Sequence, residues 1–164
     1  MKEHELGDTY YRIITADFKP EIRECSDDPV VVKTLKSDSR DSDNLTATYY
    51  TKGGVELHNN MARDGKFWTR KEAEDFLFQN ALRKQTFTDR TPVFFIQKKC
   101  DEVRLCKTVV DCLMVKNGKF RYSLFAFHER YYIAEEDIGK TVFLNYADAK
   151  TARDKYEEKL WQES

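Results

Sequence analysis

Three of the four cysteines follow one another at a regular interval, which raises the question of a metal site. Cys100, Cys106 and Cys112 are each separated by five residues, and His128 follows them. Zinc sites usually use cysteines that are two to four residues apart, so that both thiolates reach one tetrahedral ion. Because that spacing is missing, we expect no metal site and no cofactor. Cys25 and Cys106 are instead predicted to be small, buried side chains of matching strands.

The other residues with catalytic potential lack a supporting motif. A Ser or Cys nucleophile needs a neighbouring His and a carboxylate that orients it, and no such set can be assembled around His58 or His128. No glycine-rich phosphate loop is found. The carboxylate pairs Glu135-Glu136 and Glu157-Glu158 are expected on solvated faces. We therefore expect a protein that is not an enzyme.

The aromatic stretch FRYSLFAF, residues 120–127, contains the most informative pattern for binding. A strand points alternate side chains to opposite faces, and both sets here include aromatic residues. The strand is either buried on both faces, which we expect, or exposes one face. An exposed sheet with aromatic and Arg side chains stacks on single-stranded nucleic acid or anchors a protein interface. Tyr-Tyr pairs at 49–50 and 131–132 raise the same question. The candidate partner-binding residues are Asp38, Arg40, Asp41, Asp43, Tyr49, Tyr50, Arg121, Tyr122, Arg130 and Tyr131.

The composition indicates a folded protein without a general affinity for phosphate. The 164 residues are 40% hydrophobic and 13% aromatic, and the net charge is −1. Residues 1–90 hold 15 basic and 17 acidic residues, and residues 91–164 hold 13 and 12, so neither half has the basic excess that nucleic-acid binding favours. The start has no secretory pattern and no run is long enough for a membrane span. We expect a cytoplasmic protein with reduced thiols.

Two stretches of the chain share one order of residues. DGKFWTRKEAEDFL at 64–77 and IGKTVFLNYADAKTA at 138–152 each have Gly-Lys, an apolar run, a polar residue and a charged, Ala-bearing helix pattern. Upstream, YYRI at 10–13 matches VFFI at 93–96, and EIREC at 21–25 matches EVRLC at 102–106. The matched blocks lie about 83, 81 and 76 residues apart, in the same order. This order predicts a tandem duplication.

The elements expected in each copy are about five short antiparallel strands followed by a helix. Asn117-Gly118 between two apolar runs predicts a hairpin turn, and Gly53-Gly54 marks another. Thr69 with Glu72, and Asn145 with Asp148, have the spacing of a helix N-cap and its capping-box partner. The expected strands are Tyr10–Thr15, Glu21–Cys25, Val30–Leu35, Thr46–Thr51 and Val55–His58, then Pro92–Lys98, Glu102–Val115 (one long or two short), Phe120–Phe127, a strand within His128–Ile133, and Thr141–Leu144.

These elements predict an α+β fold made of two modules. Residues 1–86 would form a first β-barrel-like module plus helix, and residues 91–164 a second. Five short strands with apolar residues on both faces tend to roll into a half-open barrel that a helix flanks. A module of this size is marginal alone, so the two are expected to share an interface. The alternative is one continuous sheet made by edge pairing of the copies.

The end of the chain, GKTVFLNYADAKTARDKYEEKL, resembles the C-terminal signature of a set of small proteins from Gram-positive (Firmicutes) gut bacteria, their phages and mobile elements. That signature reads G-K-T-V-F-L-T-x-x-E-A-x-x-A-L. Gly139 to Leu144 match it, while Asn145 replaces Thr and Asp148 replaces Glu. The resemblance covers most of residues 92–160. The first copy departs from it, because only Phe67-Trp68 follow Gly65-Lys66.

The resemblance implies no chemistry, but it implies a setting among accessory genes that block host defences, such as anti-CRISPR inhibitors. We therefore expect a non-catalytic factor that binds a host protein, such as a CRISPR effector, and blocks it sterically. Asp38, Asp41 and Asp43 would imitate phosphates towards a nucleic-acid-binding partner. The alternative is a single-stranded or duplex nucleic-acid-binding module that uses Arg121, Tyr122, Arg130 and Tyr131, and no membrane partner is expected. The sequence leaves the oligomeric state open.

Overall fold

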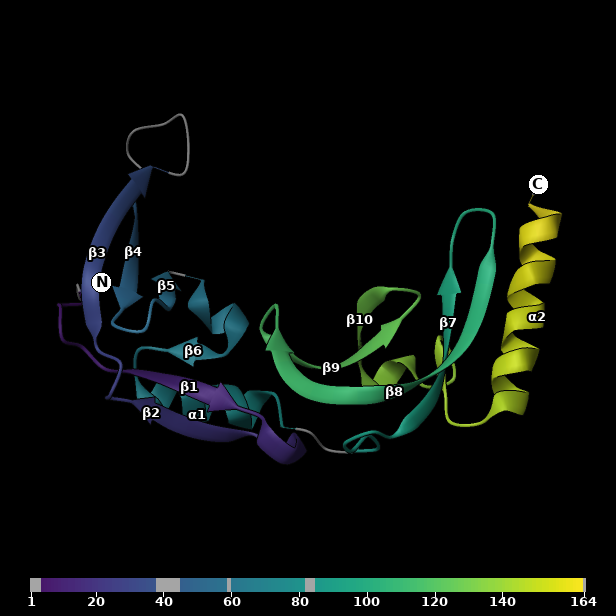
Figure 1. Cartoon of the computed structure of the whole chain (residues 1–164), viewed down its shortest axis with the longest axis horizontal. Coiled ribbons are helices and arrows are strands. Elements are labelled where there is room, and N and C mark those ends of the chain that lie inside the picture. The colour runs from purple at the N-terminus through teal and green to yellow at the C-terminus, as the bar shows by residue number, and fades with distance from the viewer. Residues whose placement is uncertain (1–3, 38–44, 59, 82–84, 164) are drawn as a thin grey trace. The chain divides into compact units, whose positions relative to one another are not determined.

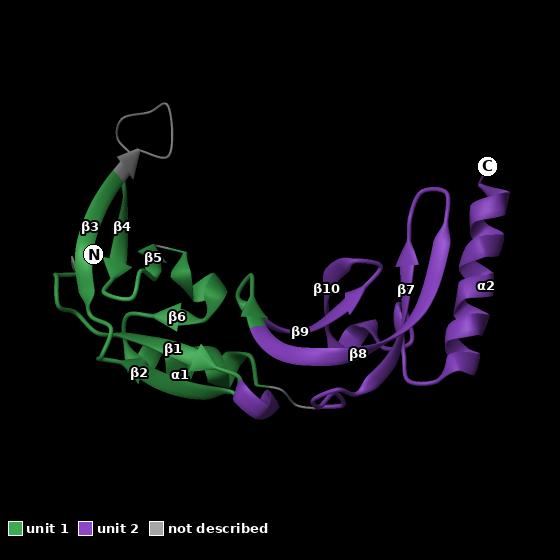
Figure 2. Cartoon of the chain, viewed as in Figure 1, with its two compact units in different colours: residues 1–15, 19–81, 115–119 green, residues 16–18, 82–114, 120–164 purple. Residues whose placement is uncertain are grey.

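The computed structural model describes residues 4–37, 45–58, 60–81 and 85–163 (Figure 1). Within these residues the chain forms three antiparallel sheets and two α-helices, which confirms the expected α+β class. The chain divides into two compact units (Figure 2): unit 1 holds residues 1–15, 19–81 and 115–119, and unit 2 holds residues 16–18, 82–114 and 120–164. The predicted module boundaries, 1–86 and 91–164, stay predictions.

The first sheet of unit 1 has the strand order β2-β1-β6. Strand β1 (Tyr10–Ile14) pairs with β2 (Glu21–Cys25) on one side and with the two-residue β6 (Lys66–Phe67) on the other. Residues Ala16–Phe18 form a 3-10 turn between β1 and β2. The register places Tyr11 opposite Phe67, and the backbone N–H of Ile13 donates to the Gly65 carbonyl at 2.8 Å.

The second sheet of unit 1 has the order β3-β4-β5. Its strands are β3 (Val30–Ser37), β4 (Leu45–Thr51) and β5 (Glu56–His58). Strands β4 and β5 pair antiparallel across Gly53-Gly54, which confirms the predicted hairpin. A 3-10 turn, Met61–Asp64, leads on to β6. The buried cluster that draws on both sheets consists of Tyr10, Cys25, Val30, Tyr49, Leu57 and Met61.

Unit 2 contains a five-stranded sheet with the order β10-β9-β8-β7-β11. The predicted hairpin at Asn117-Gly118 is confirmed: both residues have positive φ, 52° and 75°, as a two-residue turn requires. The segment expected as one long or two short strands is one strand, β8. The strands are β7 (Pro92–Lys98), β8 (Val103–Lys116), β9 (Lys119–Ala126), β10 (Glu129–Ile133) and β11 (Val142–Phe143).

The two helices begin at the predicted caps. Helix α1 (Arg70–Gln79) has a full capping box, because Glu72 N–H donates to Thr69 Oγ1 at 3.2 Å and Thr69 N–H donates to Glu72 Oε2 at 3.3 Å. Helix α2 (Tyr146–Gln162) follows the 3-10 turn Glu135–Asp137 and β11. The side chain of its N-cap Asn145 accepts from the Asp148 N–H at 2.9 Å. The Asp148 carboxylate accepts from the side-chain Nδ2 of Asn145 and not from the backbone N–H of Asn145.

The sequence predicts a half-open barrel in each module, and no closed barrel is formed, because none of the sheets in the described part of the chain closes on itself. In unit 1 the strands divide between two sheets of three strands, and a sheet of that width is too narrow to close. In unit 2 the edge strands β10 and β11 pair only with β9 and β7 respectively. The unit 2 core beneath α2 consists of Ile96, Val103, Phe143 and Ala149.

Among the helices that the structure describes, none combines the length and the apolar composition that crossing a membrane requires.

Candidate functional site

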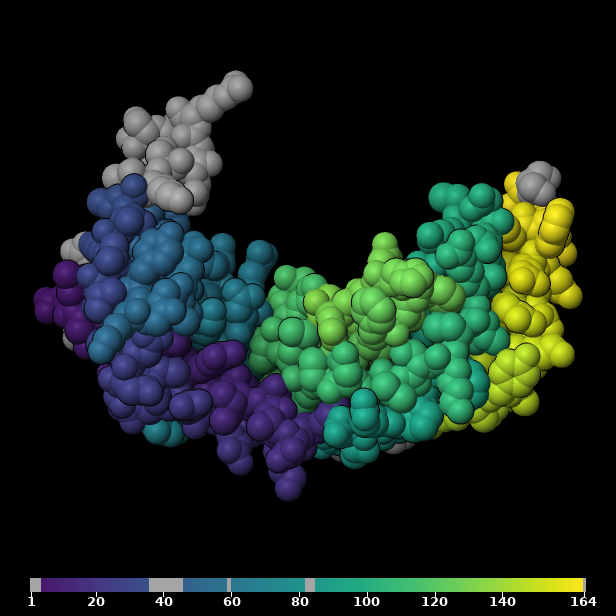
Figure 3. Space-filling view, viewed as in Figure 1, coloured from purple at the N-terminus to yellow at the C-terminus, as the bar shows by residue number. Residues whose placement is uncertain are grey.

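Strand β9 separates a buried face of the unit 2 sheet from a surface face. The register places Phe125 opposite Arg130 and Leu124 opposite Tyr131, and residues directly opposite share a face. Leu124 is fully buried, whereas Phe125 is 54% exposed. Figure 3 shows β9 and β10, in green, at the surface of the molecule. The expectation that both faces of this strand are buried is therefore wrong: one face is core and the other carries the exposed Phe125 ring.

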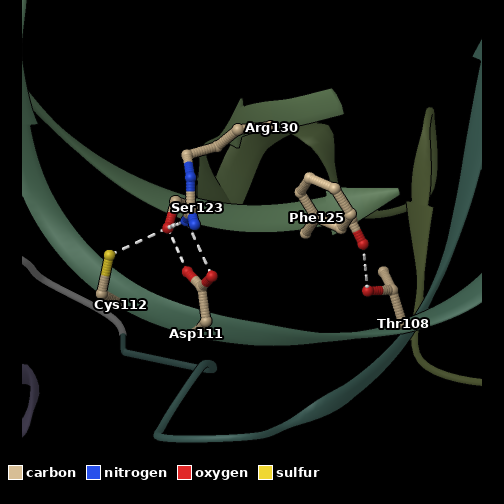
Figure 4. Close-up of polar contacts among 6 residues, drawn as sticks. All are labelled: Thr108, Asp111, Cys112, Ser123, Phe125 and Arg130. Carbon is tan, nitrogen blue, oxygen red and sulfur yellow. Dashed lines mark hydrogen bonds and ion pairs between the residues drawn. The ribbon is translucent and has the colours of Figure 1, made fainter. Parts of the chain in front are cut away.

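The surface face holds a polar network that joins three strands (Figure 4). We name this surface the outer face and define it by Asp111 of β8, Ser123 and Phe125 of β9, and Arg130 of β10. Arg130 Nη1 donates to Asp111 Oδ2 at 2.7 Å and to Ser123 Oγ at 2.9 Å. Ser123 Oγ also donates to Asp111 Oδ1, and the Cys112 sulfur lies 2.9 Å from Ser123 Oγ. These hydrogen bonds hold the Arg130 side chain beside β9, the strand that carries Phe125.

The electrostatics of the network favour the charged form of its carboxylate. Partial burial acts to raise the pKa of Asp111, but the hydrogen bonds from Ser123 and Arg130 outweigh it and hold that pKa below its ordinary value. The carboxylate is a weak base in this state, and Ser123 has no exposed surface. A general base works best with a pKa near the operating pH. The network is therefore suited to position Arg130.

A second Arg side chain lies at the strained end of the β9–β10 hairpin. The two turn residues, Phe127 and His128, have φ of 51° and 64°, which side chains other than Gly and Asn rarely adopt. The Arg104 guanidinium lies 5.8 Å from the Phe127 ring centroid and pairs with Glu102 at 2.9 Å. The Arg104 and Arg130 guanidiniums are thus both paired with carboxylates.

The structure separates the four candidate residues predicted in the second copy. Arg130 is on the outer face, and half-buried Arg121 donates to the Phe120 carbonyl at 3.0 Å. Tyr122 is in the core, 1% exposed, with its hydroxyl donating to Glu135 at 3.2 Å. Burial, then the Glu135 charge, raises the pKa of Tyr122. Tyr122 therefore offers no ring to a partner.

Tyr131 lies on the buried side of the sheet and packs against β7. Its ring centroid is 4.7 Å from that of Phe95, and its hydroxyl donates to Glu129 at 2.8 Å and accepts from Gln97. In unit 1, Tyr49 is buried at 5% exposure and Tyr50 is half-buried. The remaining candidates, Asp38, Arg40, Asp41 and Asp43, lie outside the described residues.

Of the residues that define the outer face, only Arg130 is among the partner-binding candidates that the sequence predicts. Asp111 and Ser123 come from two strands, and their bond depends on the hairpin register, which no local motif encodes. Phe125 was recognised only as one member of an alternating pattern. Its exposure became visible once the core side of β9 was known.

A groove runs along α2. Its volume is about 500 Å³, with Phe143 and Tyr156 among its apolar lining residues and both Lys155 and Asp148 among its charged ones. The Tyr156 hydroxyl donates to the Lys140 carbonyl at 2.8 Å. Side chains of both charge signs line the groove, so its electrostatics select no ligand class.

The described residues contain no group of three or more His, Cys, Asp and Glu side chains that could hold a metal ion. Burial raises the pKa of the Cys106 thiol, which disfavours the thiolate that metals bind. Comparison with protein-family models, curated proteins and solved structures gave no match.

Proposed function

We propose that this chain is a non-catalytic protein-binding factor and that the outer face of unit 2 is its contact surface. The observation that carries the proposal is Phe125, a ring that is 54% exposed beside an Arg130 side chain fixed by Asp111. Exposed aromatic and Arg side chains are the residue types that dominate binding energy at protein interfaces. An Arg already held in one geometry loses less conformational entropy when a partner binds.

The ion pairs favour a protein partner over nucleic acid. Nucleic-acid affinity comes largely from cations that neutralise phosphates. Here Arg130 is paired with Asp111 and Arg104 with Glu102, so each guanidinium has a carboxylate neighbour that would repel a phosphate. A nucleic-acid-binding module remains the competing proposal, and it predicts a gel shift that weakens steeply with salt.

The strained β9–β10 turn supports a functional role for this end of the sheet. Each residue in the left-handed region costs about 1–2 kcal/mol, and such strain concentrates at functional sites. Phe127 and His128 both adopt it where Asn-Gly would be relaxed. The turn holds the Phe127 ring against Arg104.

The biological setting that we propose is a phage or mobile-element accessory factor that sterically blocks a host defence protein, such as a CRISPR effector. This proposal rests on the resemblance of residues 139–160 to the strand–helix signature. Steric blocking requires only a shaped contact surface, and no catalytic group enters the mechanism.

We also propose that the two units arose by tandem duplication. Strand order β2-β1-β6 in unit 1 has the same form as β8-β7-β11 in unit 2. Tyr11 lies opposite Phe67, and Phe94 lies opposite Phe143. The Ile13 N–H donates to the Gly65 carbonyl at 2.8 Å, and the Ile96 N–H donates to the Thr141 carbonyl at 2.8 Å. These shared pairings support the proposal.

The test is capture of a partner by the whole chain and by two matched variants. Phe125→Asp removes the exposed ring of the outer face, and Phe78→Asp removes the 87% exposed ring of α1 as a control. We expect a protein from a host lysate to be retained by the wild type and by Phe78→Asp, and at least tenfold less by Phe125→Asp. Equal retention by all three would remove the outer face from the proposal. A salt-sensitive gel shift that Arg130→Ala abolishes would favour the competing one.

A further inference from the structure

Three aromatic rings from distant parts of the sequence meet in unit 1, and none of them belongs to the outer face. The His4 ring stacks on the Trp68 ring, with centroids 3.8 Å apart and an interplanar angle of 12°. The Tyr49 ring meets Trp68 edge-on at 5.3 Å and 82°, and meets His4 at 6.3 Å and 87°. We call His4, Tyr49 and Trp68 the aromatic cluster.

Two of these rings are fixed by the fold. Tyr49 lies in β4, is 5% exposed and belongs to the buried cluster of unit 1. Trp68 stands between β6 and the α1 cap, and its backbone N–H donates to Glu72 Oε2 at 3.2 Å, the oxygen that also accepts from Thr69. The capping box therefore sets the position of the Trp68 backbone.

His4 is attached differently, through a short turn that precedes β1. The Glu5 N–H donates to Asp8 Oδ2 at 2.8 Å, and the Gly7 N–H donates to the Val30 carbonyl at 2.7 Å. The His4 Nδ1 atom is 3.5 Å from Asp8 Oδ2, and its side chain is 28% exposed. His4 thus stacks on Trp68 from a segment that is held by the hydrogen bonds of the Glu5 and Gly7 N–H groups.

The surroundings of the His4 ring determine which chemical groups could bind in its place. A Trp face attracts cations and planar cation-bearing groups, and a perpendicular Tyr supplies a second wall. Asp8 adds a carboxylate at the edge, with its side chain 42% exposed. Lys33 Nζ lies 5.7 Å from the Tyr49 ring centroid, so the chain itself places a cation on this cluster. A flat group that carries positive charge satisfies the stacking distance, the ring quadrupoles and the carboxylate together.

We propose that Trp68, Tyr49 and Asp8 form a recess for an arginine guanidinium of a protein partner, and that His4 is a tethered occupant which this guanidinium displaces. A guanidinium is planar, stacks on aromatic faces and pairs with carboxylates, whereas a lysine ammonium is a strongly hydrated point charge. Because His4 occupies the recess in the free chain, a guanidinium can bind only during the fraction of time in which His4 is displaced. The apparent affinity for the guanidinium is reduced to that fraction. Removal of His4 should therefore open the site.

Trp68 fluorescence can report on this recess directly. The chain has two tryptophans, so Trp161→Phe leaves Trp68 as the only one. In this background we would titrate N-acetyl-arginine amide and, as the matched probe, N-acetyl-lysine amide. We expect His4→Ala to bind the arginine probe roughly tenfold more tightly than the parent, because the internal competitor is gone. Adding Asp8→Asn to His4→Ala should weaken that binding.

The control variant is His128→Ala, which removes a histidine of unit 2 and should leave probe affinity unchanged. The proposal is overturned if His4→Ala and its parent bind the arginine probe equally, if neither binds it, or if the lysine probe binds as tightly. The retention experiment with Phe125→Asp concerns unit 2, so either result can fail without the other.

Discussion

Each unit ends its sheet with a left-handed glycine, a two-residue strand and a helix cap, although in unit 2 Lys140 and Thr141 separate the glycine from the strand. The residue before the helix cap has different surroundings in the two units. In unit 1 the run is Gly65 at φ 76°, the strand β6, Trp68 and the cap Thr69. In unit 2, Gly139 has φ 86°, and β11 is followed by Leu144 and the cap Asn145. Trp68 is half-buried beneath His4, whereas Leu144 is 49% exposed.

This comparison separates the part of the run that builds the fold from the part that is free to differ. The left-handed glycine, the two-residue strand and the cap satisfy backbone hydrogen bonds, so each requires a particular residue type. The residue between strand and cap has no such requirement. In unit 1 this residue is Trp68 of the aromatic cluster, and in unit 2 it is the exposed Leu144. We infer that binding functions lie at positions that the shared scaffold leaves unconstrained.

The largest effects should come from the buried residues of β6 and β11. Phe67 and Phe143 are each 6% exposed, so Phe67→Ala and Phe143→Ala should each lower the free energy of opening of their unit by about 3–5 kcal/mol. Native-state amide exchange of α1 and α2, read separately, measures this in each unit. A loss in one unit with none in the other would show that the two runs do not have equivalent structural roles.

The glycines should give a smaller and unequal pair of effects. Gly65→Ala and Gly139→Ala each place a side chain at positive φ, which costs about 1–2 kcal/mol. A Cβ at Gly65 would also meet Val115 at 3.1 Å, whereas the space around Gly139 is open. We expect Gly65→Ala to lower the free energy of opening of unit 1 by more than Gly139→Ala lowers that of unit 2. Amide exchange of each unit measures this. The reverse order would contradict the packing at Gly65.

The caps should give effects of about 1 kcal/mol. Thr69→Ala removes one acceptor for the α1 N-terminus, and Asn145→Ala removes the corresponding acceptor of α2. Glu72→Gln keeps an acceptor for the Trp68 and Thr69 N–H groups and serves as the mild control. Circular dichroism at 222 nm during urea unfolding should show the losses. Unchanged midpoints in both cap variants would mean that these bonds do not stabilise the helices.

The smallest effect should be a pH dependence confined to unit 2. The pKa of Asp111 is lowered in the folded chain, so its contribution is complete above the unfolded carboxyl pKa of about 3.9 and is lost as pH falls through the folded value. Between pH 7 and pH 3 the wild type should therefore lose more stability than Asp111→Asn. Asp75→Asn, on exposed α1, should behave like the wild type. Equal losses in wild type and Asp111→Asn would contradict the role of the Arg130 pair.

Local signals predicted more of this molecule than long-range ones. The Thr69 and Asn145 caps and the Asn117-Gly118 turn depend on residues within four positions, and all three are confirmed. The turn at Phe127-His128 has no Gly or Asn to mark it, so the sequence placed a strand end there without predicting a left-handed turn.

Features that depend on register could not be read from the sequence. The Asp111–Arg130 pair joins residues 19 positions apart, on the two strands that flank β9. The division of the unit 1 strands into two sheets likewise depends on tertiary packing, which no short motif specifies.

We propose that a protein partner contacts the outer face of unit 2. The most direct measurement is amide hydrogen exchange of the whole chain, free and bound to the captured partner. The account predicts new protection in peptides covering residues 119–133, together with its loss in Phe125→Asp. Protection that leaves 119–133 unchanged and appears only elsewhere in the chain would contradict it.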